Sequence, residues 1–492
     1  MIAPAAPLHD RPETDGLHAV SSTTPAAIDA TSAGAADRRL LVLAILLGLA
    51  VAGGLSIAAW ATGLVLYADG ALFSFIIGLD DAWPLVWHIM PARIAVYLMT
   101  VLPAEVARDA GLPALAAMRL YQALFIGFPF IGLAACVPLL PRGARWLLLF
   151  PTVSILALGI SALGYPSETL LTLSGFWPAL FGHRYARGAL AGAALTLCCT
   201  AIFLFSHPGM VFALPLLPLA ALLCWRECRD GAVRRRLVQL GIAEAALLAL
   251  WAWRLSIEMS DPGIIRSGQR MWSLGGLEDV ITLQPAIAIV LLYIVLWAVL
   301  GWRRGRGALW LALAAFPAIA LLFGLLHTEI VTPESHYYIR TALVFLLPVL
   351  GALALWRGRT VPRGAVLLVM TGALAATQLQ HNLSFLGAWL NYRDSLAASV
   401  SVGPARVVPL QQILAGRAVP TARSTAWSWG QPYLSLTLPG LPRYAAIVAD
   451  PAPTSYSPFR CSQMDDVIAR ADWVPADTLA VLKDYVCARR PD

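Results

Sequence analysis

Long apolar stretches separated by short polar turns run along most of the chain, from about residue 40 to residue 386. Each is close to the roughly 20 residues that an α-helix needs to cross the hydrocarbon core of a bilayer. The pattern predicts an all-α polytopic membrane protein with about eleven transmembrane helices. The predicted spans are 40–66, 117–139, 146–163, 167–182, 189–206, 210–225, 237–254, 284–301, 308–326, a tenth that ends at Arg357, and 365–386.

Basic residues gather in every second turn between these stretches, and the turn over 226–236 is the richest. Because short cytoplasmic loops carry an excess of Arg and Lys, this alternation gives the topology. It predicts a cytoplasmic N-terminus, a periplasmic C-terminus and a location in the bacterial inner membrane. The long periplasmic loops are then 67–116, 256–283 and 327–340.

The two ends of the chain differ from this central part, 37–389. Residues 1–36 are rich in Ala, Ser, Thr, Pro and Asp, which predicts a disordered cytoplasmic tail rather than a cleaved signal. Residues 390–492 lack apolar runs and predict a small mixed α/β periplasmic domain, with a strand near 444–448 and a helix near 475–489. Cys461 and Cys487 are candidates for a disulfide there, because an oxidising periplasm permits pairing.

The composition agrees with a membrane protein, since 59% of the residues are hydrophobic and only 13% are charged. The net charge of +7 comes from arginines in the turns, so it reports topology and not a nucleic-acid partner. No Gly-rich phosphate loop is present in the sequence, so we expect no nucleotide cofactor.

Acidic residues near the membrane concentrate on the predicted outer face. Asp80 and Asp81 lie within an apolar and aromatic stretch, where desolvation and mutual repulsion are expected to raise the pKa of at least one carboxyl. Glu168 follows the third span and is a second candidate acid or a metal ligand, although it also suits the first turn of a helix. A solvated loop explains any one of these acids better than function does, but the group, and Asp80–Asp81 above all, favours an outward-facing site.

Binding of a phosphate on that face requires cations, and arginine holds phosphate oxygens bidentately. An interfacial role, with the charged head reaching out to water, explains Arg340 equally well, and an interfacial turn explains His207 better than a binding site does. The candidate substrate-binding residues are Arg93, His207, Arg266, Arg270, His336 and Arg340.

This arrangement resembles the GT-C superfamily of integral-membrane glycosyltransferases. The resemblance rests on a first span followed by a long outer loop with the acidic pair Asp80–Asp81, on Glu168 after the third span, and on a C-terminal periplasmic domain. It implies transfer of a sugar from a polyprenyl-phosphate donor to a glycan, lipid or protein acceptor. One of the two aspartates would be the general base, and Glu168 would assist in binding the acceptor or a divalent metal.

Three other classes are also compatible with the sequence. A lipid-linked glycan polymerase or ligase would rely on outer arginine and histidine, for which Arg266, Arg270 and His336 are candidates. A transporter would need ionisable residues at mid-membrane depth and often an internal repeat, and the sequence shows neither clearly, although Glu244 inside the seventh span must face a partner. A membrane scaffold would leave the acids scattered in space.

Overall fold

The computed structural model describes most of the helical part of the chain. The residues described are 35–67, 69–80, 82–85, 87, 90–162, 168–185, 190–258, 295–297, 299–302, 307–314, 335–357, 361–400, 403–414, 430–438, 446–449 and 459–489. Within them the protein is mostly helical, with one two-stranded sheet.

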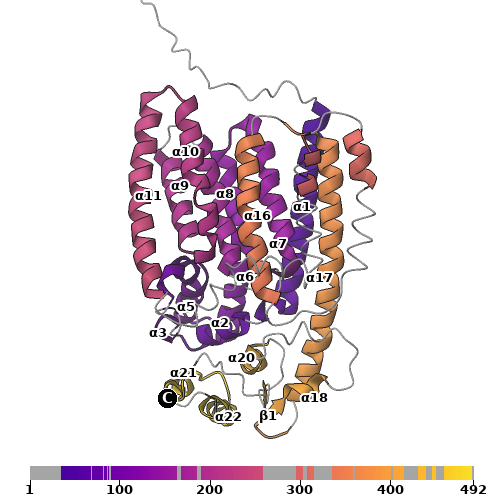
Figure 1. Cartoon of the computed structure of the whole chain (residues 1–492). Helices are drawn as coiled ribbons and strands as arrows, with labels where there is room; N and C mark the ends of the chain where they lie inside the picture. Colours follow the sequence, from indigo (N-terminus) through magenta and orange to yellow (C-terminus); the bar gives the residue numbers. More distant parts are fainter. Residues whose placement is uncertain are drawn as a thin grey trace, which may run out of the picture.

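The long helices form one upright bundle, shown in Figure 1. They alternate in direction along the chain, and a helix of about 20 apolar residues is long enough for a bilayer. In chain order they are α1 (Ala35–Thr62), α6 (Ala114–Leu139), α7 (Leu149–Ala162), α8 (Glu168–Tyr185), α9 (Leu190–Leu204), α10 (Leu216–Glu227), α11 (Gly231–Glu258), α16 (Ser335–Arg357) and α17 (Gly364–Val400).

Three of the described helices are long and apolar enough to cross a membrane, namely α1, α6 and α11. Their exposed side chains are large and apolar, as lipid-facing residues are: Ile57 is 66% exposed and Ile242 is 67% exposed. The chain is therefore a membrane protein. Most of the predicted spans 284–301 and 308–326 lie outside the described residues, so the count of eleven stays a prediction.

Several helices extend beyond the apolar stretches that predicted them. The fourth predicted span, 167–182, is a full helix, α8, of 18 residues. The eleventh, α17, has 37 residues and continues past residue 389 to Val400, so one helix joins the bundle to the C-terminal unit. Polar residues near its end do not break it, because helix length follows hydrogen bonding and packing as well as hydropathy.

The predicted outer loop 67–116 is largely helical and lies at one end of the bundle. It follows η1 (Leu64–Leu66) and contains α2 (Asp69–Gly78), α3 (Ala82–Leu85), η3 (Pro91–Arg93), α4 (Ile94–Val96), η4 (Tyr97–Val101) and α5 (Leu102–Asp109). We call α2 to α5 the cap. Nine of the ten residues of α2 are buried, so it lies inside the protein and is not a surface loop.

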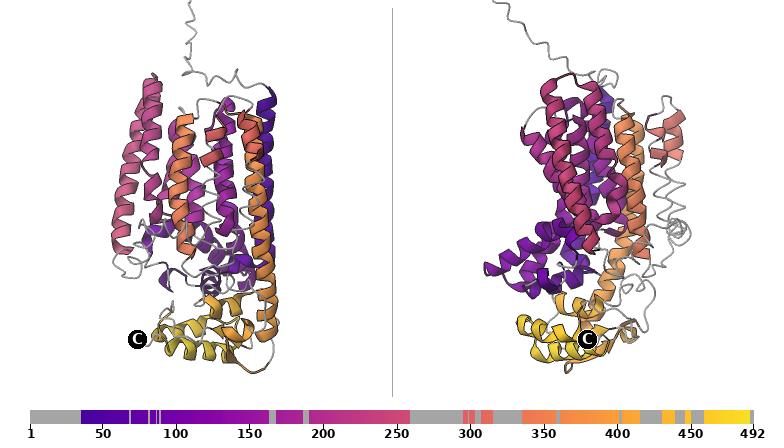
Figure 2. Two further views of the ribbon diagram at one scale, coloured as in Figure 1. Left: turned by 45° about the vertical axis from the view of Figure 1, so that its right-hand side comes forward. Right: turned by 60° about the vertical axis from the view of Figure 1, so that its left-hand side comes forward.

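The C-terminal unit packs under the cap, at the end of the bundle away from the basic turns (Figures 1 and 2). It holds two paired parallel strands, which confirms the predicted mixture of helix and strand. Its elements are β1 (Arg406–Pro409), α18 (Leu410–Leu414), α20 (Gln431–Thr437), β2 (Ala446–Ala449), η8 (Cys461–Gln463), α21 (Met464–Arg470) and α22 (Ala476–Cys487).

A tight contact joins this unit to the cap. The indole Nε1 of Trp473 donates to the carbonyl oxygen of Gly78 at 2.8 Å, and Arg108 Nη2 lies 3.3 Å from Asp472. A Cβ on Gly78 would lie 2.6 Å from the Trp473 ring and 2.6 Å from Met118, so only glycine permits this approach. The C-terminal unit thus holds the end of α2 in place.

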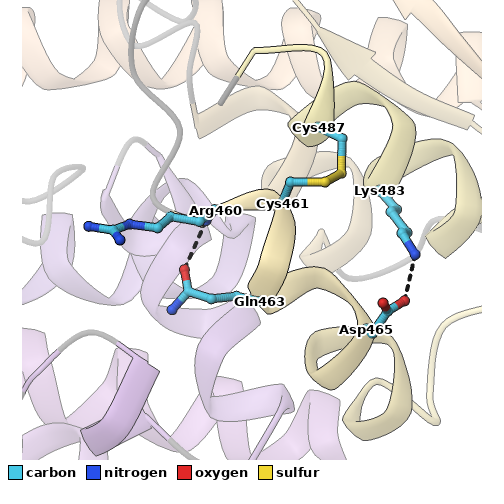
Figure 3. The surroundings of a disulfide bond; sticks show 6 residues. All are labelled: Arg460, Cys461, Gln463, Asp465, Lys483 and Cys487. Carbon is cyan, nitrogen blue, oxygen red and sulfur yellow. Dashed lines mark hydrogen bonds and ion pairs between the residues drawn. A yellow bond between two sulfur atoms is a disulfide. The ribbon is translucent and has the colours of Figure 1, made fainter. Parts of the chain in front are cut away.

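Cys461 and Cys487 form a disulfide between the start of η8 and the end of α22, with Cα atoms 4.5 Å apart (Figure 3). The ion pair Lys483–Asp465 lies beside it at 2.6 Å, but it is exposed and adds little. The disulfide closes a loop whose ends are 26 residues apart in sequence.

We expect the double replacement Cys461→Ser and Cys487→Ser to destabilise the C-terminal unit by about 3–4 kcal/mol, because the unfolded chain regains loop-closure entropy. Limited proteolysis should then release fragments of 459–489 before the bundle is cut. Cys198→Ser, which removes an exposed thiol from α9, is the control and should leave the digestion pattern unchanged. Equal protease resistance of the disulfide-free and parent chains would contradict this expectation.

Candidate functional site

Asp80 ends the buried helix α2 and is exposed to solvent. Its φ of 59° makes it the one residue other than glycine, among those described, with a left-handed backbone. Aspartate tolerates this conformation better than most residues, yet such positions recur at functional sites. The backbone before it is fixed, because Arg108 Nη1 donates to the carbonyl oxygen of Ile77 at 3.1 Å and Trp473 donates to that of Gly78.

The exposure of Asp80 corrects one expectation. The residue is exposed, although the helix α2 that it follows is buried. The sequence analysis inferred an apolar environment for Asp80 because its neighbours are apolar. In the structure the residue lies on a left-handed turn and is exposed. Asp81 lies outside the described residues, so the effect of two adjacent charges stays a prediction.

A buried ionic cluster joins the cap to the outer ends of α8 and α11. Arg93, at the end of η3, donates from Nε to Glu258 Oε1 at 2.7 Å and from Nη1 to Glu168 Oε2 at 2.9 Å. The side chains are 14%, 0% and 3% exposed for Arg93, Glu258 and Glu168 respectively. We call these three residues the outer triad.

The triad has a net charge of −1 when all three groups are ionised, since one guanidinium faces two carboxylates. Burial alone would lower the pKa of the Arg93 guanidinium, but attraction to Glu168 and Glu258 outweighs it and raises that pKa. The arginine therefore stays charged. Oε2 of Glu258 is buried and has no hydrogen-bond partner among the described residues.

This geometry changes the interpretation of Arg93 and Glu168. The sequence proposed Arg93 as a phosphate-binding residue, but two carboxylates neutralise its charge, which leaves little attraction for an anion. Glu168 begins α8, as its first-turn position predicts, and also pairs with Arg93 through both carboxylate oxygens. The structure brings two predicted site residues together, but as an ion pair.

His207 has a local structural role. It precedes η6 (Pro208–Ala213), and its Nδ1 accepts a hydrogen bond from the backbone N–H of Gly209 at 3.0 Å. It also borders a small apolar pocket with Phe203 and Trp251. The hydrogen bond makes His207 the N-cap residue of η6.

The remaining predicted residues cannot be compared with the structure. Arg266 and Arg270 lie outside the described residues, and the side chains of His336 and Arg340 in α16 are also outside them. In the part of the chain that is described, no three His, Cys, Asp or Glu side chains form a metal-binding group. A metal requirement therefore stays open.

Two acids to which the sequence analysis assigns no role, Glu105 and Glu258, are buried in the structure. Glu105 is 7% exposed, accepts from the backbone N–H of Ala82 at 2.6 Å, and accepts from the Tyr97 hydroxyl at 3.1 Å. It holds α3, which follows the Asp80 turn, against η4 and α5. The position of Glu258 at the end of an apolar helix was a usable signal, because a carboxylate there requires a partner.

Comparisons with family models, with curated proteins and with solved structures find no match to this chain. A function for the protein is therefore inferred from its fold and its side-chain geometry.

Proposed function

We propose that the protein is a membrane glycosyltransferase that transfers a sugar from a polyprenyl-phosphate donor to a glycan, lipid or protein acceptor on the periplasmic face. The observation that carries the proposal is Asp80, an exposed carboxylate on a left-handed turn. The backbone just before it is held by hydrogen bonds from Arg108 to Ile77 and from Trp473 to Gly78. A positioned carboxylate of this kind can accept a proton from an acceptor hydroxyl.

The location of the cap supports the same assignment. The basic turn between α10 and α11 and the cap lie at opposite ends of the bundle (Figure 1). With eleven spans and the basic turns inside, the cap and the C-terminal unit face the periplasm, where polyprenyl-linked sugars are available and nucleotide sugars are not. The disulfide Cys461–Cys487 suits that oxidising compartment.

The chemistry requires little covalent work from the protein. A lipid phosphate is a good leaving group, so the enzyme must position it, stabilise its charge and supply a base to the acceptor. Asp80 supplies the base in this proposal. The outer triad holds η3, and with it the cap, on the ends of α8 and α11, while the donor phosphate must be met by cations other than Arg93.

The proposal is tested by reconstituting the purified protein in vesicles with a polyprenyl-phosphate carrying a radiolabelled sugar and a mixed periplasmic glycan and lipid acceptor fraction. Transfer of label to the acceptor, with release of polyprenyl phosphate, is the expected result. The same vesicles supplied with a nucleotide sugar in place of the lipid donor should show no transfer. Label that stays on the carrier with every acceptor, across the pH range in which the protein remains folded, would contradict the proposal.

A second candidate, a transporter, is favoured by one observation. Glu244 lies at the middle of the 28-residue helix α11 and contacts His183, so an ionisable pair lies at membrane depth. Uptake of labelled carrier sugar into sealed vesicles, without cleavage of the phosphate–sugar bond, would identify this class instead.

A further inference from the structure

Arg119 lies near the start of α6, at the cap end of the bundle, and pairs with no carboxylate in the described part of the chain. Its Nη1 donates to the backbone carbonyl oxygen of Trp60 on α1 and, at 3.4 Å, to Oε1 of Gln122. The indole Nε1 of Trp60 donates in return to the carbonyl oxygen of Arg119 at 3.2 Å. These contacts fix the guanidinium between the outer ends of α1 and α6. We call the three residues the α1–α6 cluster.

The cluster has more hydrogen-bond donors than its described neighbours use. Nε and Nη2 of Arg119 donate to none of the described residues. They form one edge of the planar guanidinium, and such an edge binds two oxygens of one phosphate side by side. The Gln122 side chain is 0% exposed, and its Nε2 is a buried donor without a partner among the described residues. The geometry therefore suits a ligand that only accepts hydrogen bonds.

The surroundings of the cluster are apolar and face lipid. Ile57, about one turn before Trp60 on α1, is 66% exposed, and Leu115, about one turn before Arg119 on α6, is 40% exposed. Because α6 begins at the outer end, Leu115 lies further out than Arg119, by about 6 Å from the helical rise. A cation at this depth is costly unless an anion meets it. The phosphate of a lipid is an anion that the bilayer itself supplies.

Arg254, near the outer end of α11, provides a matched comparison. Its guanidinium carbon lies 4.8 Å from the centre of the Trp253 ring, and Trp253 is 56% exposed. It makes no hydrogen bond to a described residue, as expected of an arginine whose charged head reaches into the headgroup region. Arg119 also lies over a tryptophan ring, at 5.5 Å from that of Trp60, but hydrogen bonds between two helices hold it in place. Arg119 is preorganised for a ligand and Arg254 is not.

We propose that the α1–α6 cluster binds the phosphate of an anionic phospholipid in the outer leaflet. Nε and Nη2 of Arg119 donate to two phosphate oxygens, and the acyl chains lie against the exposed apolar residues of α1. A zwitterionic headgroup is disfavoured, because no carboxylate among the described residues pairs with Arg119 or is positioned by it to receive an ammonium group. The site is independent of the sugar-transfer proposal, since it depends only on contacts between α1 and α6.

The test is native mass spectrometry of the full chain in detergent with added phosphatidylglycerol or phosphatidylcholine. One phosphatidylglycerol should stay on the parent chain at a collision energy that removes phosphatidylcholine. Arg119→Gln should weaken the binding of this lipid by about 10- to 100-fold, the contribution of a hydrogen bond to a charged group. Arg254→Gln is the control and should bind the lipid as the parent does. Inorganic phosphate at the same concentration should not displace it, because the acyl chains also contribute to binding.

Three results would overturn the proposal: unchanged binding in Arg119→Gln, equal retention of the two lipids, or the same loss of binding in Arg119→Gln and Arg254→Gln. Displacement by inorganic phosphate would assign the site to a free anion and overturn the lipid as its ligand. If Arg119→Gln does not fold, Arg119→Lys replaces it, because lysine keeps the charge but lacks the planar pair of donors. Weaker binding in Arg119→Lys supports the site, and parental affinity contradicts it.

Discussion

Replacing Asp80 by asparagine is expected to lower the rate of sugar transfer by about 10²- to 10⁴-fold, the contribution of a positioned general base. The substitution suits the site, because asparagine also adopts the left-handed backbone that Asp80 has at φ 59°. Since the side chain is exposed, the fold should be retained, and the unfolding midpoint should stay within about a degree of the parent value.

The control for this prediction is Asp109→Asn, which removes an exposed acid from the end of α5 in the same cap and should leave the rate unchanged. Asp81→Asn is measured in parallel. Loss of transfer in the Asp81 variant alone would identify Asp81, and not Asp80, as the general base. Full activity in both variants would show that neither carboxylate of this turn is the general base.

Replacing Arg93 by glutamine should cost about 3–5 kcal/mol, because it leaves two buried carboxylates without their counter-charge. Thermal unfolding in detergent should show a large fall of the midpoint, and the cap should become sensitive to protease before the bundle does. The cause is local, since Arg93 connects η3 with the ends of α8 and α11 through Glu168 and Glu258.

The matched control removes the charges together. A triple variant with Arg93→Gln, Glu168→Gln and Glu258→Gln has no uncompensated charge, so we expect it to recover most of the lost stability. If the single and triple variants unfold at the same temperature, the large cost comes from lost packing and not from buried charge. If the single variant unfolds at the parent temperature, the outer triad does not hold the cap.

Much of the helical architecture was predictable from the sequence, because apolar runs near membrane length leave few alternatives. The fourth span near 167–182 corresponds to α8, and the predicted C-terminal helix 475–489 corresponds to Ala476–Cys487, with Pro475 before its first residue. The strand predicted near 444–448 is β2, and the candidate pair Cys461–Cys487 forms a disulfide.

The contacts between distant segments were not predictable. Arg93 and Glu258 are 165 residues apart, and no local pattern indicates that they meet. His183 was assigned to a cytoplasmic turn because basic residues follow it, whereas the structure continues α8 to Tyr185 and buries the imidazole beside Glu244. Asp80 was placed in an apolar setting because its neighbours are apolar, yet a single positive φ exposes it.

The most direct test of the central claim is the side of the membrane on which the cap lies. A membrane-impermeant maleimide is applied to intact spheroplasts that carry Asp80→Cys in the cap or Arg229→Cys in the exposed α10–α11 turn at the opposite end of the bundle. The labelling of each variant is compared with that of the unsubstituted chain. The account predicts labelling at position 80 in intact cells and at position 229 only after lysis. Labelling of position 229 in intact cells, with position 80 protected until lysis, would place the cap in the cytoplasm and contradict sugar transfer on the periplasmic face.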